Sequence, residues 1–282
     1  MDAVSYMGLR LTKPPHYGWV IEGDIKSYFD TIDHKKLMNI LKKRLKDKKI
    51  LHLIERFLGA GVLEGQKLFQ SNLGAPQGGI LSPLLANIYL DLLDTYMEQY
   101  TELSKYVKGY RKKRGLGNFL YVRYCDDFVV LCNGTREHAE AMKKELSDFL
   151  ATELKLELSW EKTRVTHIKD GIQFLGFEID RNRAGSGKLA PRIRIPRSAA
   201  KRLTAKARAI LKGPTQDSVN SKIQALNRMI RGWCQYYQST SSPAGIFARV
   251  EYEVFGLMAH WLGKKFKLSM PRVMKRFRKG NQ

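Results

Sequence analysis

The segment Tyr121–Cys132, YVRYCDDFVVLC, predicts a tight β-hairpin with two acids at its tip. The runs Phe119–Arg123 and Phe128–Cys132 are short, apolar and rich in aromatic and β-branched residues, which is typical of buried strands. An Asp-Asp pair taken alone is more often a solvated turn. The apolar flanks of Asp126 and Asp127 favour a cation site instead, because adjacent buried charges are costly unless something neutralises them.

A third acid follows another apolar run. Gly18–Ile25 is rich in β-formers and ends at Asp24, after which Asp33 is placed to cap an amphipathic helix at 34–45. Asp24 alone could be only a helix-entry cap. Two aspartates at a hairpin tip and a third at a strand end nevertheless match what magnesium takes, one or two carboxylates completed by phosphate oxygens and water.

The order of elements predicts an α+β fold: a mixed or antiparallel sheet with helices on one face, followed by an all-helical domain. We expect domains at 1–180 and 197–282, joined by a linker or connecting strand at 181–196. The other expected elements are helices at 48–58, 84–97 and 136–151, a hairpin in 59–70, loops at 71–82 and 105–117, strands at 154–158, 163–168 and 172–179, and helices at 196–211, 218–237 and 244–266.

Positive charge is concentrated in the last third of the chain. Residues 1–180 hold 27 basic and 24 acidic residues, whereas residues 181–282 hold 23 basic and 3 acidic ones. Aromatic residues lie among these cations, so base stacking could accompany phosphate contacts, although most of the rings are expected in the core. Nucleic acid is therefore the favoured partner, over a membrane surface or a role in solubility alone.

Several classes of protein are not supported. The three cysteines form no CxxC pair and the six histidines are scattered, so neither a zinc site nor a disulfide framework is indicated, and a reducing compartment is the simplest home. No apolar run approaches 18 residues and the first residues lack a signal-peptide pattern. We expect a protein without a membrane partner.

Five ordered segments carry a family resemblance, namely WVIEGDIKSYFDTIDH, GAPQGGILSPLLANIYLDLLD, the hairpin, LSWEKT and FLGFEI. They resemble the catalytic motifs of reverse transcriptases encoded by group II introns. The later segments PRIRIP, IQALNRMIRGWCQYY and HWLGKKF are similar to the maturase or thumb domain of those proteins. The resemblance covers nearly the whole chain.

The resemblance implies an RNA-directed DNA polymerase that uses two Mg²⁺ ions, for which Mn²⁺ could substitute. It also implies that the sheet is a polymerase palm and that the protein belongs to a bacterial cytoplasm or an organellar matrix. It implies intron RNA, an RNA template with a DNA primer, and deoxynucleoside triphosphates as partners. The site residues that it implies are the following: Asp24, Asp126, Asp127 and the carbonyl of Ile25 as metal ligands, Lys162 as the acid for pyrophosphate, Phe29 beneath the sugar, Gln77 and Gly78 at the incoming nucleotide, and Phe174, Leu175, Gly176 and Phe177 as the primer grip.

Simpler interpretations remain open for three of these assignments. Phe29 could be a core aromatic, Lys162 a surface lysine, and the segment 174–177 ordinary strand packing. In the basic region we predict RNA contacts by a wider set: Arg192, Arg194, Arg197, Lys201, Arg202, Arg228, Arg231 and Trp233.

Two departures from the family pattern affect function. Cys125 stands where these enzymes usually have alanine, a change that keeps the hairpin plausible. Only 23 residues precede Asp24, so we expect an N-terminally truncated protein that lacks most of the fingers region: a fragment, a partial gene or one half of a split enzyme. A homodimer or a separate fingers fragment is a further candidate partner. The chain also stops before the zinc-bearing endonuclease that some relatives append.

Two main hypotheses follow. The chain is either a polymerase that also holds its intron RNA, or a non-catalytic maturase whose palm is a scaffold or an inactive fragment. An RNA-dependent RNA polymerase is disfavoured by Phe29 and by the intron-type thumb.

Overall fold

The structure is a computed structural model that describes residues 3–12, 16–60, 62–64, 67–69, 73–75, 79–183, 187, 189–213 and 216–277, with only the backbone at 62–64 and 67–69. The chain separates into two compact units. The first comprises Met1–Leu175 and Asp180–Ala190, and the second comprises Gly176–Ile179 and Pro191–Gln282. Each unit is described by itself.

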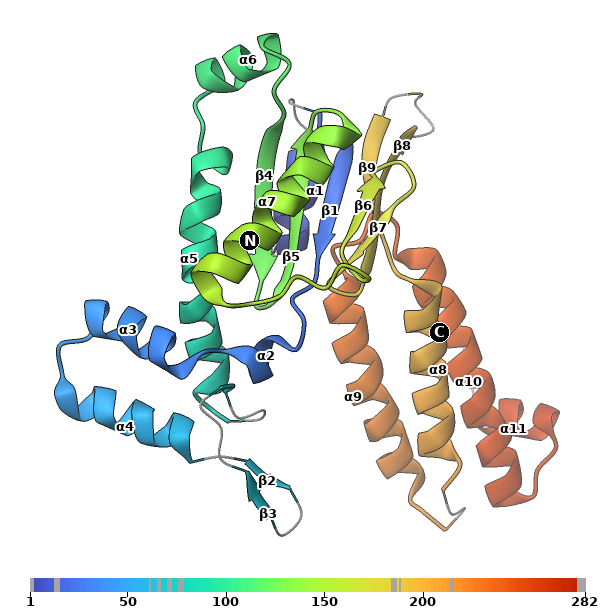
Figure 1. The fold of residues 1–282 in the computed structure, drawn as a ribbon. Helices are drawn as coiled ribbons and strands as arrows, with labels where there is room; N and C mark the ends of the chain where they lie inside the picture. The colour runs from blue at the N-terminus through green and yellow to red at the C-terminus, as the bar shows by residue number, and fades with distance from the viewer. Residues whose placement is uncertain are drawn as a thin grey trace. The chain divides into compact units, whose positions relative to one another are not determined.

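A four-stranded antiparallel sheet in the order β4-β5-β1-β6 forms the centre of the first unit (Figure 1). Its strands are β1 (Trp19–Gly23), β4 (Asn118–Tyr124), β5 (Asp127–Asn133) and β6 (Arg164–His167). Strand β1 pairs with β5 on one side and with β6 on the other. The predicted hairpin and the predicted strand before Asp24 are both confirmed.

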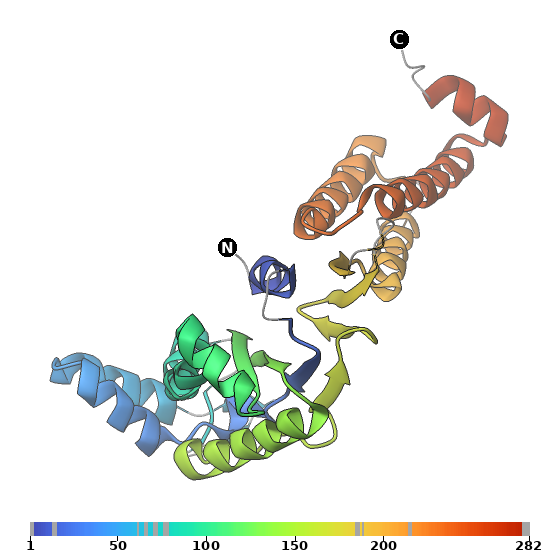
Figure 2. The ribbon, with the colours of Figure 1, turned by 90° about the horizontal axis from the view of Figure 1, so that it is seen from above.

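Both faces of this sheet are covered. Ile21 and Val130 are fully buried in a cluster with residues of α5 (Ser82–Thr101) and α7 (Arg136–Leu154). The alternate residues Val20 and Leu131 are also fully buried, and α1 (Ala3–Thr12) lies on the side of the sheet away from α7 (Figure 2). The sequence predicted helices on one face of the sheet only. The structure has helices on that face and also has α1 on the opposite face.

Helices α2 (Tyr28–Thr31), α3 (His34–Arg44) and α4 (Lys48–Gly59) follow β1. The side chain of Asp33 accepts a hydrogen bond from the Lys36 amide, and that of Asp47 accepts from the Lys49 and Ile50 amides. These bonds satisfy amides that have no partner within the helix. The predicted cap at Asp33, both helices and the following β2–β3 hairpin (Val62–Glu64 and Lys67–Phe69) are confirmed.

Two expected elements differ. The predicted loop at 105–117 contains a helix, α6 (Lys105–Lys113), which begins where the Ser104 side chain accepts from the Val107 amide. The predicted strand at 154–158 is absent, because α7 continues to Leu154 and stops at Lys155, which has a left-handed φ of 51°. The residues after Leu154 alternate as in a strand, but Leu154 itself still belongs to the buried face of the helix.

Three further strands, β7 (Ile172–Phe174), β8 (Phe177–Arg183) and β9 (Leu189–Arg194), pair in that order. The single strand expected at 172–179 is broken at Leu175 and Gly176, whose φ angles of 47° and 71° are both left-handed. Two successive residues of this kind form a turn and not a strand. Strands β8 and β9 also occupy much of the segment predicted as a linker or connecting strand.

The second unit is mainly helical. It contains α8 (Arg197–Leu211), α9 (Val219–Tyr237), α10 (Ala244–Phe266) and α11 (Met270–Phe277), of which the last was not predicted. Leu203, Leu226 and Val254 meet in a common core, and Thr204 on α8 donates a 2.9 Å hydrogen bond to Glu253 on α10. No helix in the described ranges is long and apolar enough to cross a membrane.

Candidate active site

Strand β1 delivers Asp24 to the edge of the site. The last ladder pair joins Gly23 to Phe128, so Asp24 leaves β1 beside Asp127 at the start of β5. A β-carbon at Gly23 would lie 2.1 Å from the Phe128 ring. Only glycine therefore lets the ring lie across β1 at this point and keeps the two strands in register.

The other acids come from the turn between β4 and β5. Tyr124 pairs with Asp127, which leaves Cys125 and Asp126 as the two turn residues. Cys125 has a φ of 55°, which is uncommon for a residue other than glycine. The turn thus holds a local conformation that the rest of the structure must stabilise.

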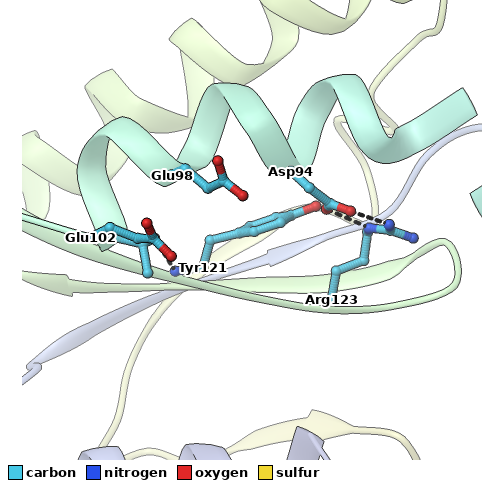
Figure 3. A pocket seen from close by; sticks show the side chains of 6 residues that line it. Asp94, Glu98, Glu102, Tyr121 and Arg123 are labelled. Carbon is cyan, nitrogen blue, oxygen red and sulfur yellow. Dashed lines mark hydrogen bonds and ion pairs between the residues drawn. The ribbon is translucent and has the colours of Figure 1, made fainter. Parts of the chain in front are cut away.

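Arg123 provides that support. Its Nη1 donates to the carbonyl of Cys125 at 2.7 Å and to Oδ1 of Asn87 at 2.8 Å. Its Nε donates to Oδ1 of Asp94 at 2.7 Å, and its Nη2 donates to the second oxygen of the same carboxylate (Figure 3). Asn87 and Asp94 both lie on α5, so this guanidinium joins the helix to the turn that carries Asp126.

The acids influence one another electrostatically. Partial loss of solvent around Asp127, together with the charges of Asp126 and Asp24, raises the pKa of the Asp127 carboxyl. Oδ2 of Asp24 is buried and accepts no hydrogen bond, although Lys162 Nζ lies 3.4 Å away as an ion-pair partner. Excess negative charge and an unsatisfied buried oxygen are features that a bound cation would relieve.

These acids are not a closed metal cage. Within the described parts of the chain, no three side chains of the His, Cys, Asp and Glu types are arranged to hold a metal ion by themselves. Magnesium commonly takes only one or two protein carboxylates and completes its shell with phosphate and water. The oxygen donors of Asp24, Asp126 and Asp127 therefore fit an ion that arrives with a nucleotide.

The segment 157–163 surrounds the backbone of Asp24. Its carbonyl accepts from the Ser159 amide at 2.8 Å, and its amide donates to Oγ1 of Thr163 at 3.3 Å. The neighbouring bridge between Ile25 and Leu158 is formed by bonds that do not use the Ile25 carbonyl. The Ile25 carbonyl oxygen, which was predicted as a metal ligand, is thus not used in that bridge. Lys162 is exposed and lies beside Asp24.

The nucleotide-binding predictions are only partly visible. Phe29 is half-buried in α2, packs against the core cluster and meets Tyr28 edge to face at 5.4 Å. Its carbonyl accepts from the Ala75 amide at 2.7 Å, which brings the start of the GAPQGG segment beside α2. Gln77 and Gly78 lie outside the described residues. The role predicted for Phe29 stays a prediction.

The predicted primer grip is the β7–β8 turn. Phe174 and Phe177 are buried on either side of Leu175 and Gly176. Within the second unit, the Tyr237 hydroxyl donates to the Gly176 carbonyl at 3.1 Å, and the Phe177 ring stacks on Tyr236 at 5.2 Å.

The residues predicted to contact RNA are spread over β9, α8 and α9, and most of them are exposed. Arg228 and Arg231 line a hollow on α9 together with Gln224 and Asn227. Trp233 is half-buried between Tyr237 and Phe247, at 5.0 and 5.6 Å. It has the packing environment that was expected for most rings of this region.

Sequence reasoning did not assign Arg123, Asp94 or Thr163. A signal for Arg123 was present, because an arginine in the apolar run before the two acids must find a partner when the strand is buried. Nothing local indicated that the partner would be Asp94.

Comparison with known proteins identifies the family. A family model described as "Reverse transcriptase (RNA-dependent DNA polymerase)" matches residues 5–179, more than half of the chain. This chain belongs to the reverse transcriptase family. A second model, "Group II intron, maturase-specific domain", matches residues 200–279 of this reverse transcriptase. The resemblance to group II intron-encoded reverse transcriptases is confirmed.

Relatives of this reverse transcriptase include bacterial and mitochondrial proteins. The group II intron-encoded protein LtrA of Lactococcus lactis is 36% identical over 62% of this chain and 37% of its own length. Protein YkfC of Escherichia coli is 34% identical, with coverages of 68% and 55%. The putative COX1/OXI3 intron 2 protein of Saccharomyces cerevisiae is 26% identical, with coverages of 93% and 38%. The chain thus spans about half or less of each relative.

Among solved structures, apo telomerase from Candida tropicalis aligns with a TM-score of 0.49 at 16% identity, covering 97% of this chain and 46% of that one.

Proposed function

We propose that this chain is an RNA-directed DNA polymerase of a group II intron, which copies RNA into DNA by two-metal nucleotidyl transfer and binds intron RNA to assist splicing. The observation that carries the polymerase part is the placement of Asp24 and Asp127 side by side on neighbouring strands, with Asp126 in the turn between β4 and β5. The raised pKa of Asp127 supports the same proposal, because it arises from partial burial of the carboxyl and, after that, from the negative charges of Asp126 and Asp24.

The donor set fits magnesium. Asp24, Asp126 and Asp127 would hold two Mg²⁺ ions, with the Ile25 carbonyl as a further ligand and Mn²⁺ as a substitute. Such ions lower the pKa of a primer hydroxyl and neutralise charge on the leaving pyrophosphate. The buried, unsatisfied Oδ2 of Asp24 is the structural feature that supports an ion at this point.

Other residues would bind and orient the substrates. Lys162, exposed beside Asp24, would donate a proton to pyrophosphate. Phe29 would pack beneath the sugar and select deoxynucleotides, with Gln77 and Gly78 near the incoming base. The turn at Leu175 and Gly176 would hold the primer end, supported by the hydrogen bond to Gly176 from Tyr237.

The second unit would hold intron RNA. Its basic residues are mostly exposed while its apolar residues form a core, so its cations are available to phosphates. In the alternative function, this binding alone stabilises the folded intron and the palm no longer polymerises.

Primer extension by the purified chain on an RNA template with a DNA primer tests the proposal, with an Asp126→Asn/Asp127→Asn variant as the control. Extension by the wild type alone supports the polymerase. If the wild type does not extend the primer, while both the wild type and the variant support splicing, the polymerase function is overturned and the maturase function remains. Absence of both extension and RNA binding would contradict the whole proposal.

A further inference from the structure

Helix α6 is held in place although it contributes no buried side chain. A helix this short does not persist in water without support. The support here is polar: Lys108 Nζ donates to the Thr101 carbonyl at 2.9 Å, and Arg111 donates twice to the Gly117 carbonyl, at 3.2 and 2.9 Å. The Asn118 side chain donates to the Lys108 carbonyl at 3.1 Å. The chain thus fixes a helix whose outer face plays no part in the core.

That outer face combines two exposed rings with a lysine. At 100° per residue, the residues opposite Lys108 and Arg111 are Tyr106, Gly109, Tyr110 and Lys113. The side chains of Tyr106 and Tyr110 are 83% and 49% exposed, and the Arg114 guanidinium lies over the Tyr110 ring at 5.2 Å. Two tyrosines on one helical face, four residues apart, are thus presented to solvent beside cations.

The charge around α6 is uniformly positive. Lys105–Arg114 contains six basic residues and no acidic one, whereas the other residues of 1–180 include 21 basic and 24 acidic residues. Partial loss of solvent lowers the pKa of Lys108, and the nearby positive charge of Arg10 on α1 lowers it further. A cation added beside other cations opposes folding by itself, and an anionic ligand would relieve that repulsion.

Gly109 lies on the outer face and is not required by packing. A β-carbon placed there would have no neighbouring atom within 4 Å. Glycine weakens a helix relative to alanine, so its position here brings no advantage to the fold. It leaves the helix backbone open between the tyrosines and lysines, where a sugar or phosphate can approach closely.

We propose that the outer face of α6 binds single-stranded RNA, with bases stacked on Tyr106 and Tyr110 and phosphates bound by Lys113 on that face and by the exposed Lys105 and Lys112 that flank it. Stacking on exposed rings requires bases that are not already stacked in a duplex, and the lysines match the backbone charge. The choice of RNA as the nucleic acid rests on the proposed function.

This surface is separate from the catalytic acids. Helix α6 precedes β4, and the turn with Asp126 follows the other end of that strand (Figure 1). Seven strand residues span roughly 20 Å or more. RNA on α6 would therefore be a stretch of the bound RNA away from the reacting primer end, contacted in addition to the helical second unit.

The stacking part is tested with the full chain by fluorescence anisotropy on labelled single-stranded RNA and on a duplex of the same sequence. Tyr106→Ala/Tyr110→Ala should bind the single strand about fivefold or more weakly, with little change for the duplex. The matched Tyr106→Phe/Tyr110→Phe variant keeps the rings and should bind like the wild type. Both variants should have the melting temperature of the wild type, because α6 buries no side chain.

The charge part is tested by salt dependence. Replacing two phosphate contacts in Lys112→Gln/Lys113→Gln should reduce the slope of log affinity against log salt by about 1.4 for a single strand. Lys42→Gln/Lys43→Gln removes the same charge from exposed positions in the last turn of α3 and should leave the slope unchanged. Photo-crosslinking of RNA that contains 4-thiouridine should label the peptide 105–114.

Wild-type affinity in the tyrosine-to-alanine variant, with no crosslink in 105–114, would overturn this inference. Equal losses for single-stranded and duplex RNA would overturn the stacking. If Arg228→Gln/Arg231→Gln weakens binding while the α6 variants do not, RNA binding by the second unit is supported and the α6 site is excluded. A wild-type chain that binds no RNA would overturn both the α6 site and RNA binding by the second unit.

Discussion

Arg123 Nη1 donates a 2.7 Å hydrogen bond to the carbonyl of Cys125, the residue that opens the acid-bearing turn with a left-handed φ of 55°. A non-glycine residue in such a conformation costs about 1–3 kcal/mol, so it persists only where neighbours impose it. Asp94 and Asn87 fix the guanidinium in turn. The position of Asp126 therefore depends on a side chain that is not itself an acid of the site.

Arg123→Lys should slow primer extension by about tenfold or more while the chain remains folded. Lysine cannot bind a carboxylate through two parallel N–H groups and also reach two carbonyl oxygens, so the turn loses its defined position. Leaving the partly buried Asp94 with fewer partners should also lower the free energy of unfolding by about 1–3 kcal/mol. Single-turnover extension and urea unfolding measure the two effects.

Arg44→Lys is the matched control, because Arg44 pairs with Asp91, which lies on α5 as Asp94 does. The side chains of that pair are 60% and 37% exposed, against 11% and 33% for Arg123 and Asp94. An exposed pair contributes about 0–1 kcal/mol, so extension should not change. Wild-type extension by Arg123→Lys would contradict a positioning role for Arg123.

Asp127→Asn should stabilise the folded chain at pH 7 in the absence of divalent ions. The pKa of Asp127 is raised in the folded state above its usual 3.8, so the stability present below that value is lost as the pH rises through the folded pKa. Thermal melts in EDTA should therefore show the variant above the wild type at pH 7, with a difference that shrinks toward pH 4.

Magnesium should reverse that order. It should raise the melting temperature of the wild type more than that of Asp127→Asn, since the ion is expected to bind the ionised carboxylates. Asp148→Asn, which removes an exposed acid from α7, should respond to magnesium like the wild type. Equal magnesium responses for Asp127→Asn and the wild type would speak against a metal at these acids.

The sheet and most helices could be predicted because their patterns are local. The apolar runs around Asp126 and the capping sequence at Asp33 each specify an element without reference to the rest of the chain. Leu154 shows where this fails: the alternation after it is typical of a strand, but the face formed with Leu146 and Leu150 continues the helix. Leu154 fits both the helical and the strand periodicity, and its burial in the folded chain places it in the helix.

The supports of the site could not be predicted in the same way. The acids are adjacent in sequence, or end a recognisable strand, whereas Arg123 and Asp94 are 29 residues apart and meet only because α5 packs beside β4. Helix α6 was missed for a related reason. It lacks the apolar face that identifies a helix in a sequence, and side-chain bonds to backbone carbonyls hold it instead.

Gly23→Ala should destabilise the first unit by about 1–3 kcal/mol, because the new methyl would meet the Phe128 ring at 2.1 Å. Urea unfolding measures the loss, and extension should fall with it as β1 and β5 separate. Combination with Phe128→Leu should cost less than the sum of the two single changes. Gly59→Ala, where no atom lies within 4 Å, should be close to neutral, and an equal loss there would refute the steric explanation.

Tyr237→Phe should lower stability by about 0.5–1.5 kcal/mol through loss of the hydroxyl bond to the Gly176 carbonyl. The ring remains, so its edge contact with Phe177 is retained. If the turn at Gly176 holds the primer, the KM for primer should rise while kcat changes little. Tyr252→Phe, at a 79% exposed position, should alter neither quantity, and no change in either for Tyr237→Phe would argue against this support.

Lys162→Ala should reduce the single-turnover rate of nucleotide addition by about 10²–10⁴-fold if Lys162 protonates pyrophosphate. Stability should hardly change, because the side chains of Lys162 and Asp24 are 72% and 36% exposed, so solvent screens their ion pair. Lys162→Arg separates proton transfer from charge, since arginine keeps the charge but does not release a proton at neutral pH. Rapid-quench measurements that show full recovery with arginine would assign Lys162 to neutralising Asp24, and an unchanged rate in the alanine variant would exclude it from the reaction.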